Sequence, residues 1–197
     1  MIESYQELYE TGRIKTEHLL IGNGFSIGIW RDFNYTSLYE KQQESLEIRD
    51  RMLFKQLNTT NFEVVLENII KAVHINQIFN YEVYELLQSY ERIKNALIQA
   101  VIKVHPENYE LQLNSDIELN NTFKIFKKSI FTTNYDLIPY WLHIKLLKQQ
   151  RVINDFFRNN GKLYLNFVPE SINNSLNLYY LHGGLHLFVK GFTSISY

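Results

Sequence analysis

Three short segments of this chain each follow an apolar run, and between them they supply glycines, an asparagine amide and a histidine imidazole. They read Gly22-Asn23-Gly24-Phe25-Ser26, Thr132-Thr133-Asn134-Tyr135-Asp136 and Tyr180-Leu181-His182-Gly183-Gly184. Glycine lets a ligand approach the backbone closely, an asparagine amide both donates and accepts hydrogen bonds, and a neutral histidine accepts a proton. Because parallel α/β sheets bind ligands at the carboxyl ends of their strands, we expect the three segments to form one nucleotide site.

The glycine segment suits a phosphate group. Backbone amides and a helix N-terminus offer partial positive charge without bulk, and the Ser26 hydroxyl can donate a further hydrogen bond. The spacing of Gly22, Gly24 and Gly28 misses the dinucleotide pattern Gly-x-Gly-x-x-Gly by one residue. An ordinary strand-to-helix turn is the alternative interpretation.

Each polar residue of the other two segments also has a structural alternative. Asn134 suits a capped turn, and His182 suits a histidine packed near the end of a strand. Asp136 precedes an apolar stretch, so it can serve as the N-cap of a helix from Leu137 to Lys148.

The elements that must position these residues follow from hydrophobic periodicity. Thr60-Asn61-Phe62-Glu63 matches a capping box, and apolar residues follow it at helical spacing. We expect strands at 18–21, 129–132 and 176–181, with further candidate strands at 163–168 and 185–189. We expect helices at 2–11, from 27, at 81–104 and at 137–148, and a largely helical insertion at about 37–126.

Composition excludes several classes of protein. The 197 residues suit one domain, no run of 18 apolar residues indicates a membrane span, and the polar N-terminus is unlike a signal peptide, so a cytoplasmic location is expected. A net charge of −1 does not favour direct contact with nucleic acid. The chain has no cysteine, and His186, four residues after His182, lies on an expected strand or turn, so no metal site is expected.

Taken in order, the three segments resemble the motifs of the SIR2-like (sirtuin-related) family: a Gly-x-Gly-x-Ser loop, a Thr-x-Asn-x-Asp loop and a His-Gly pair. The sequences of these segments are most similar to those of divergent bacterial members grouped with anti-phage NAD hydrolases. The resemblance frames residues 18–184. It implies an α/β fold, with a Rossmann-like parallel sheet and the helical insertion inside a single SIR2-like domain spanning residues 1–197.

The resemblance also implies roles for the site residues. Asn134 would orient the ribose and the attacking water, His182 would be the catalytic base, and Asp136 would bind ribose hydroxyls, cap the helix, or do both. The residues expected to bind the NAD substrate are Gly22, Asn23, Gly24, Phe25, Ser26, Thr133, Asp136 and Gly183.

The activity implied is hydrolysis of NAD+ to nicotinamide and ADP-ribose in a bacterial anti-phage defence system, with no cofactor beyond NAD as substrate. Lysine deacylation is not expected, because deacylating members carry a four-cysteine zinc ribbon and this chain has no cysteine. Few residues follow Gly184, so the sheet is smaller than in that family, a partner completes it, or the chain is a truncated or naturally short member, and we expect that the active form is not a lone monomer. The resemblance also implies control of activity through a homo-oligomer or a companion sensor subunit. The alternative is a non-catalytic subunit that senses NAD or ADP-ribose, or a structural subunit of a defence complex.

Overall fold

The computed structural model describes residues 5–107, 123, 125–148, 153–159, 165–169 and 176–187. These residues divide into two compact units. The first contains the described residues up to Phe25 and those from Phe123 to Leu187, and the second runs from Ser26 to Glu107. The helical unit takes in most of the expected insertion, and residues 108–122 of that expectation lie outside the described part of the chain.

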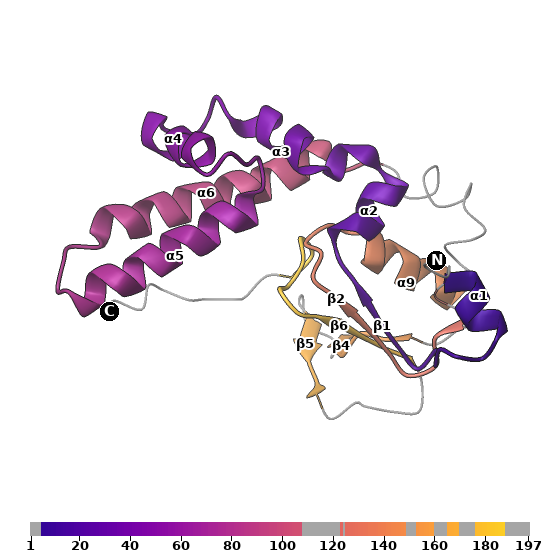
Figure 1. The fold of residues 1–197 in the computed structure, drawn as a ribbon. Helices are drawn as coiled ribbons and strands as arrows, with labels where there is room; N and C mark the ends of the chain where they lie inside the picture. The colour runs from indigo at the N-terminus through magenta and orange to yellow at the C-terminus, as the bar shows by residue number, and fades with distance from the viewer. Residues whose placement is uncertain are drawn as a thin grey trace. The chain divides into compact units, whose positions relative to one another are not determined.

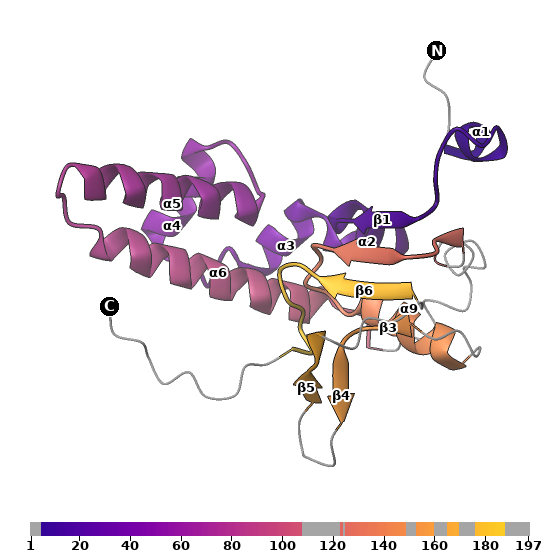
Figure 2. The ribbon, with the colours of Figure 1, turned by 90° about the horizontal axis from the view of Figure 1, so that it is seen from below.

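A four-stranded parallel sheet lies at the centre of the first unit (Figure 1). Its strands follow the order β1 (His18–Ile21), β2 (Ser129–Thr132), β6 (Leu176–Tyr180) and β3 (Ile153–Asn154). Every pairing in this sheet is parallel, and Figure 2 shows β1, β2 and β6 as neighbours running the same way. The prediction that the three motif-bearing strands share one parallel sheet is therefore confirmed, and the fold is α/β.

Burial separates the central strands from the edge strand β1, whereas both residues of the other edge strand, β3, are buried. Ile130 of β2 and Leu178 of β6 are fully buried, whereas Leu20 of β1 is 67% exposed. Central strands of a parallel sheet are covered on both faces, which explains why β2 and β6 stand out in the sequence as apolar runs.

Helix α9 (Ile138–Lys148) follows β2 and packs into the core of the first unit. Its residues Ile138, Leu142 and Leu146 are spaced four apart and fully buried, as expected for one apolar helix face. The Ile138 amide donates a 2.9 Å hydrogen bond to Asp136 Oδ1. The Asp136 carboxylate therefore caps the first amide of this helix. The helix starts one residue later than expected, so the N-cap position itself is Leu137, whose carbonyl accepts the Trp141 amide at 2.8 Å.

The remaining elements of the first unit are short. Helix α1 spans Tyr5–Glu10, and β4 (Phe157–Asn159) pairs in an antiparallel hairpin with β5 (Leu165–Phe167), which lies inside the strand expected at 163–168. Leu185 and His186 lie in a turn and Leu187 is in no strand, so the strand expected at 185–189 is wrong for these three residues; positions 188 and 189 lie outside the described residues.

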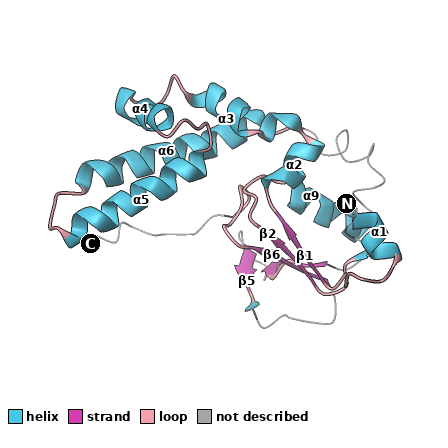
Figure 3. Ribbon diagram, viewed as in Figure 1, coloured by secondary structure: helices cyan, strands magenta, loops and turns pink. Residues whose placement is uncertain are grey.

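The described residues of the second unit are helices and connecting loops (Figure 3). Helices α5 and α6 lie side by side, and the buried Asp50 carboxylate of α4 accepts hydrogen bonds from Ser89 and Arg92 of α6. The bounds of the elements are η1 (Arg31–Phe33), α3 (Tyr35–Gln42), α4 (Ile48–Gln56), α5 (Phe62–Ile78) and α6 (Tyr84–Val104). No described helix has the length and apolar character that a membrane crossing requires.

Three predictions about helix starts are wrong. Helix α6 begins at Tyr84, three residues later than the expected Tyr81. The N-cap of α5 is Asn61, whose side chain accepts the Glu63 amide at 2.9 Å, so the capping box built on Thr60 does not form. The glycine segment was expected to be a loop before a helix that begins at Ile27. Instead, helix α2 (Asn23–Ile29) begins inside the segment, directly after Gly22.

Candidate functional site at the carboxyl edge of the sheet

The three motif segments leave the sheet at the same edge. The register aligns Ile21 with Thr132 and Thr132 with Tyr180, so neighbouring strands end at the same level. Main-chain hydrogen bonds continue this alignment past the strands, because the Thr133 amide donates to Ile21 O at 3.1 Å and the Leu181 amide donates to Thr132 O at 2.9 Å. The carboxyl ends of β1, β2 and β6 therefore carry the glycine, asparagine and histidine segments side by side.

Gly22 and Thr133 approach each other closely at this edge. A Cβ atom added to Gly22 would lie 3.4 Å from Thr133 Oγ1, in ordinary van der Waals contact with this hydroxyl. The Phe25 amide donates to Gly22 O at 2.9 Å and begins α2. Asn23, Gly24 and Phe25 thus form the start of a helix beside the Thr133 segment, rather than an open loop.

Asn134 and Asp136 are held inside the second segment. Each is 4% exposed. The Asn134 main-chain amide donates to Thr132 Oγ1 at 3.1 Å, and Asp136 caps α9. The structural interpretation of Asp136 is therefore correct, and the segment is a rigid turn tied to both β2 and α9.

The third segment packs directly on the second. His182 is exposed, and its ring stacks on Tyr135 with 5.9 Å between ring centroids. The Leu185 amide donates to Tyr135 O at 2.8 Å. Gly183 has a φ of +82°, a backbone conformation that favours glycine and allows the chain to turn back after His182. His182 thus lies beside the residue that follows Asn134.

Ser26 is the one predicted site residue that the first unit does not contain. It lies on α2 within the second unit, and its side chain is fully buried. We therefore build the site from Gly22, Thr133, Asn134 and His182, with Asp136 and Gly183 in supporting positions.

Sequence reasoning missed a group of aromatic and ionisable side chains behind this edge. The His186 ring stacks on Tyr140 with 4.3 Å between centroids and meets Tyr180 edge to face at 4.9 Å. Tyr140 also stacks on His143, at 6.3 Å. His143 Nε2 in turn lies 4.0 Å from Asp155 Oδ2. The one sequence signal for this group is His186 itself, a histidine between two leucines.

Burial sets the charge state of this group. It lowers the pKa of His186 to about 4, against the opposing effect of the Asp155 carboxylate, so the ring is neutral at pH 7. Burial also lowers the pKa of His143, again opposed by Asp155, and it raises the pKa of Tyr180. Among the described residues, no group of three or more His, Asp or Glu side chains is placed to hold a metal ion.

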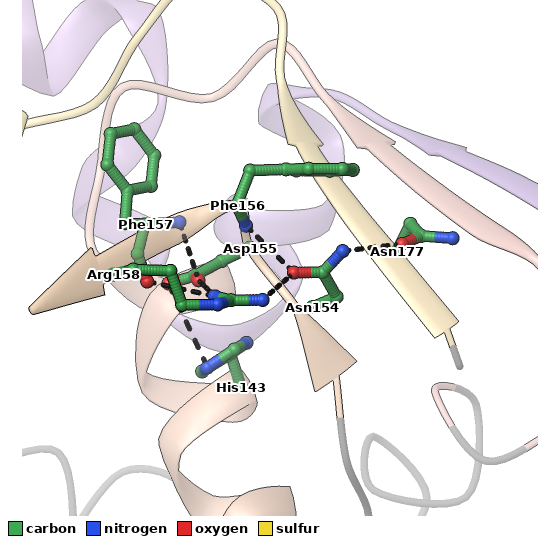
Figure 4. Close-up of polar contacts among 7 residues, drawn as sticks. All are labelled: His143, Asn154, Asp155, Phe156, Phe157, Arg158 and Asn177. Atoms are coloured by element: carbon green, nitrogen blue, oxygen red, sulfur yellow. Dashed lines mark hydrogen bonds and ion pairs between the residues drawn. The ribbon is translucent and has the colours of Figure 1, made fainter. Parts of the chain in front are cut away.

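Asp155 belongs to a polar network that connects β3 to its neighbours (Figure 4). Arg158 donates to Asp155 Oδ1 at 3.3 Å and also bonds Asn154 Oδ1. Asn154 Nδ2 donates to Asn177 Oδ1 of the adjacent strand at 2.9 Å. The Arg158 side chain is 39% exposed, so this network reaches the surface at β4.

Comparison with known proteins identifies a family. The model of a family described as a domain of unknown function, DUF4917, matches residues 19–195. The match covers most of the chain and includes all three motif segments, so the chain belongs to this family. The search of curated proteins finds no match. The family description names no activity, so function is inferred from the residues at the carboxyl edge of the sheet.

Proposed function

We propose that this member of the DUF4917 family hydrolyses NAD+ to nicotinamide and ADP-ribose, as the SIR2-like resemblance of its motifs implies. One observation carries the proposal. The glycine, asparagine and histidine segments follow three adjacent parallel strands that end at the same level. This is the edge at which open α/β sheets bind nucleotides.

The proposed reaction breaks the bond between the nicotinamide nitrogen and C1′ of the ribose. The bonding electron pair leaves with nicotinamide, which becomes neutral, so the reaction needs no general acid and the sugar becomes oxocarbenium-like. A water oxygen then bonds to C1′ and loses a proton. In this proposal the proton passes to the exposed imidazole of His182 and then to solvent.

The other residues hold the substrate. The amide of Asn134 would orient the ribose and the water, because it both donates and accepts hydrogen bonds. The backbone of the Gly22–Phe25 segment would face the phosphates, with the Thr133 hydroxyl beside it. Asp136 holds the turn in place by capping α9, and a contact with ribose hydroxyls is a further part of the proposal.

The proposed setting is an abortive-infection defence against phage in the bacterial cytoplasm. An enzyme that destroys NAD is toxic when always active, so we propose that its activity depends on a homo-oligomer or on a companion sensor subunit rather than on direct contact with nucleic acid. Light scattering on the active form tests this. A fully active monomer would contradict the dependence on assembly.

A non-catalytic subunit that senses NAD or ADP-ribose is the second candidate. The burial of Asn134 favours it, because a 4% exposed side chain offers little surface to a reacting sugar unless the turn adjusts. The exposure of His182 favours the enzyme. The two candidates predict different outcomes of a single incubation with NAD+.

The test measures nicotinamide release by the purified chain, alone and with any co-purifying partner. We expect His182→Ala to lower turnover by about 10²–10⁴-fold, because a positioned proton acceptor contributes that much. Asn134→Ala should lower it by about 10²-fold through misplacement of the reactants. The Asn134 main-chain bond to Thr132 does not involve the substituted side chain, so the turn should survive.

His74→Ala is the matched control, because it removes an exposed histidine from helix α5 in the other unit and should leave turnover unchanged. The double variant should be scarcely slower than either single one, since residues that act as one unit are not additive. Full turnover in His182→Ala would rule out the proposed mechanism. Saturable binding of NAD or ADP-ribose without turnover in the wild type would favour the sensing candidate.

A further inference from the structure

His186 occupies a defined place in the turn that carries His182. Its ring lies between Tyr140 of α9 and Tyr180 at the end of β6, stacked on the first and edge-on to the second. Both ring nitrogens are buried, and neither has a hydrogen-bond partner among the described residues. The ring therefore contributes through its shape and its aromatic contacts rather than through hydrogen bonds to those residues.

The rest of the turn is built around this ring. A Cβ atom on Gly184 would lie 3.1 Å from His186 Cε1 and 3.2 Å from Nδ1, so the absence of a side chain at position 184 gives the ring its room. The Leu187 amide donates to Gly184 O at 2.9 Å, which closes the turn around His186. The Leu185 amide, next to His186, donates to Tyr135 O and joins the turn to the asparagine segment.

These contacts connect His186 to His182 through Tyr135. The bond from Leu185 holds the Tyr135 carbonyl, and the Tyr135 ring stacks on the His182 ring. If the His186 ring were removed, the turn would lose its packing on α9 and β6. His182 would then be held mainly by the end of β6 and its own contact with Tyr135.

The surroundings of His186 also select a neutral ring. The groups that face it are Tyr140 and His143 on α9, Tyr180 on β6, and Asp155 after β3. Among the described residues, Asp155 is the carboxylate that acts on its pKa, and this carboxylate is already engaged by Arg158 and lies near His143. Burial of the ring is the main cause of its lowered pKa, and His143 lowers it further, so the ring that stacks on Tyr140 is uncharged at pH 7.

We infer that His186 is a positioning residue: its ring, wedged between Tyr140 and Tyr180, fixes the 181–187 turn and thereby the place of His182 beside Tyr135. The inference rests on the proposed function for its consequence in turnover. It rests on the packing alone for its consequence in the structure of the turn.

The test compares two substitutions of one side chain. His186→Ala removes the wedge, and His186→Phe keeps an aromatic ring without nitrogen atoms. We expect His186→Ala to lower kcat for nicotinamide release by about 10²-fold, because a displacement of about 1 Å at a catalytic group has that effect. KM should change little, since the glycine segment that faces the phosphates is not part of the turn. His186→Phe should restore most of kcat.

Leu146→Ala is the control for a general loss of stability. Leu146 is fully buried on α9, so its removal weakens the same unit and leaves the His186, Tyr140 and Tyr180 rings in place. At a temperature where all variants are folded, Leu146→Ala should keep its kcat, although its unfolding midpoint falls at least as far as that of His186→Ala. Wild-type kcat in folded His186→Ala would overturn the inference, and so would a His186→Phe variant as slow as His186→Ala.

Hydrogen exchange measured by NMR tests the inference without any activity. Exchange of the Leu185 amide should accelerate in His186→Ala and stay close to wild type in His186→Phe, with the Leu178 amide of central strand β6 as the internal reference. An unchanged Leu185 exchange rate in His186→Ala would overturn the positioning role. Absence of nicotinamide release by the wild-type protein would instead overturn the proposed function and leave this exchange result to decide the role of His186.

Discussion

Replacement of Gly183 by alanine would test whether the turn geometry at His182 matters for function. Gly183 has a φ of +82°, and an added Cβ would meet no atom within 4 Å, so the effect is one of backbone conformation and not of collision. An L-residue in the left-handed region costs about 1–2 kcal/mol. Alanine also restricts the unfolded chain, which offsets about 0.4–1 kcal/mol of this cost. The expected net loss of unfolding free energy is about 1 kcal/mol.

Such a loss leaves the protein folded, because single domains are stable by about 5–15 kcal/mol. Any large loss of turnover in Gly183→Ala would therefore come from a change at the site itself, through a displaced His182 or through the Gly183 backbone that is expected to bind NAD. Gly12→Ala is the matched control: Gly12 has a φ of +67°, has equally open space around it, and follows helix α1 rather than a motif strand. We expect nicotinamide release to fall in Gly183→Ala and to stay unchanged in Gly12→Ala.

The stability measurement can be confined to the first unit. The chain has two tryptophans, Trp30 in the helical unit and Trp141 on α9, so urea unfolding in a Trp30→Phe background reports Trp141 alone. If Gly183→Ala matched the parent in both unfolding midpoint and turnover, the reasoning from the positive φ would be refuted. Equal losses of turnover in the Gly183 and Gly12 variants would show that the effect is not local to the turn.

Two further predictions concern pH and capping. Burial lowers the pKa of His186 to about 4, whereas an unfolded histidine titrates near 6.5, so the unfolded chain binds more protons between these values and stability should fall as pH drops from about 6.5 towards 4. Urea midpoints measured against pH should fall less steeply for His186→Phe, and the remaining slope should come from His143, whose pKa is also lowered. Equal slopes for the wild type and His186→Phe would contradict the assignment to His186. Asn61→Ala should destabilise α5 by about 1 kcal/mol through loss of the cap, whereas Thr60→Ala should have a much smaller effect on thermal unfolding. A larger loss of stability in Thr60→Ala than in Asn61→Ala would favour the capping box on Thr60 instead.

The strands that carry the motifs could be located from sequence because they lie in a parallel sheet and their ends are marked by glycine or polar residues. The bounds expected for β1 and β2 agree with the structure, and β6 ends one residue earlier than expected. Apolar runs that end in glycine or in polar residues are typical of strands in a parallel sheet, whose ends face a ligand site. By contrast, β3 has two residues, too few to form any hydrophobic pattern, and its place is set by pairing with β6.

Helix starts were harder to predict because neighbouring residues compete for the same cap. Thr60 and Asn61 both have side chains that can accept an amide hydrogen bond, and the structure selects Asn61, whose Oδ1 reaches the Glu63 amide. Asp136 had no such competitor next to Ile138, and its capping role was predicted correctly. The glycine segment became helical because the Phe25 amide bonds Gly22 O, a local choice that glycine content alone does not decide.

The polar group behind the site was missed for a different reason. Tyr140, His143, Asp155, Tyr180 and His186 come from α9, the segment after β3, the end of β6 and the turn beyond it. Their contacts depend on the order β2-β6-β3, in which β6, the last of these strands in the chain, lies between the other two. Spacing along the chain contains no trace of this crossover, so no motif search would have grouped them.

The contrast between Asn134 and His182 defines what the edge of the sheet can do. Asn134 is buried in a turn that is bonded to Thr132 and ends at the cap of α9, so its position is set by the core of the first unit. His182 is exposed and is held by a ring contact with Tyr135 and by the turn around His186. A reaction at this edge would therefore combine one rigid polar group with one histidine whose position depends on the 181–187 turn. If the proposed reaction occurs, changes in that turn would alter turnover without unfolding the sheet, because the turn lies beyond the end of β6.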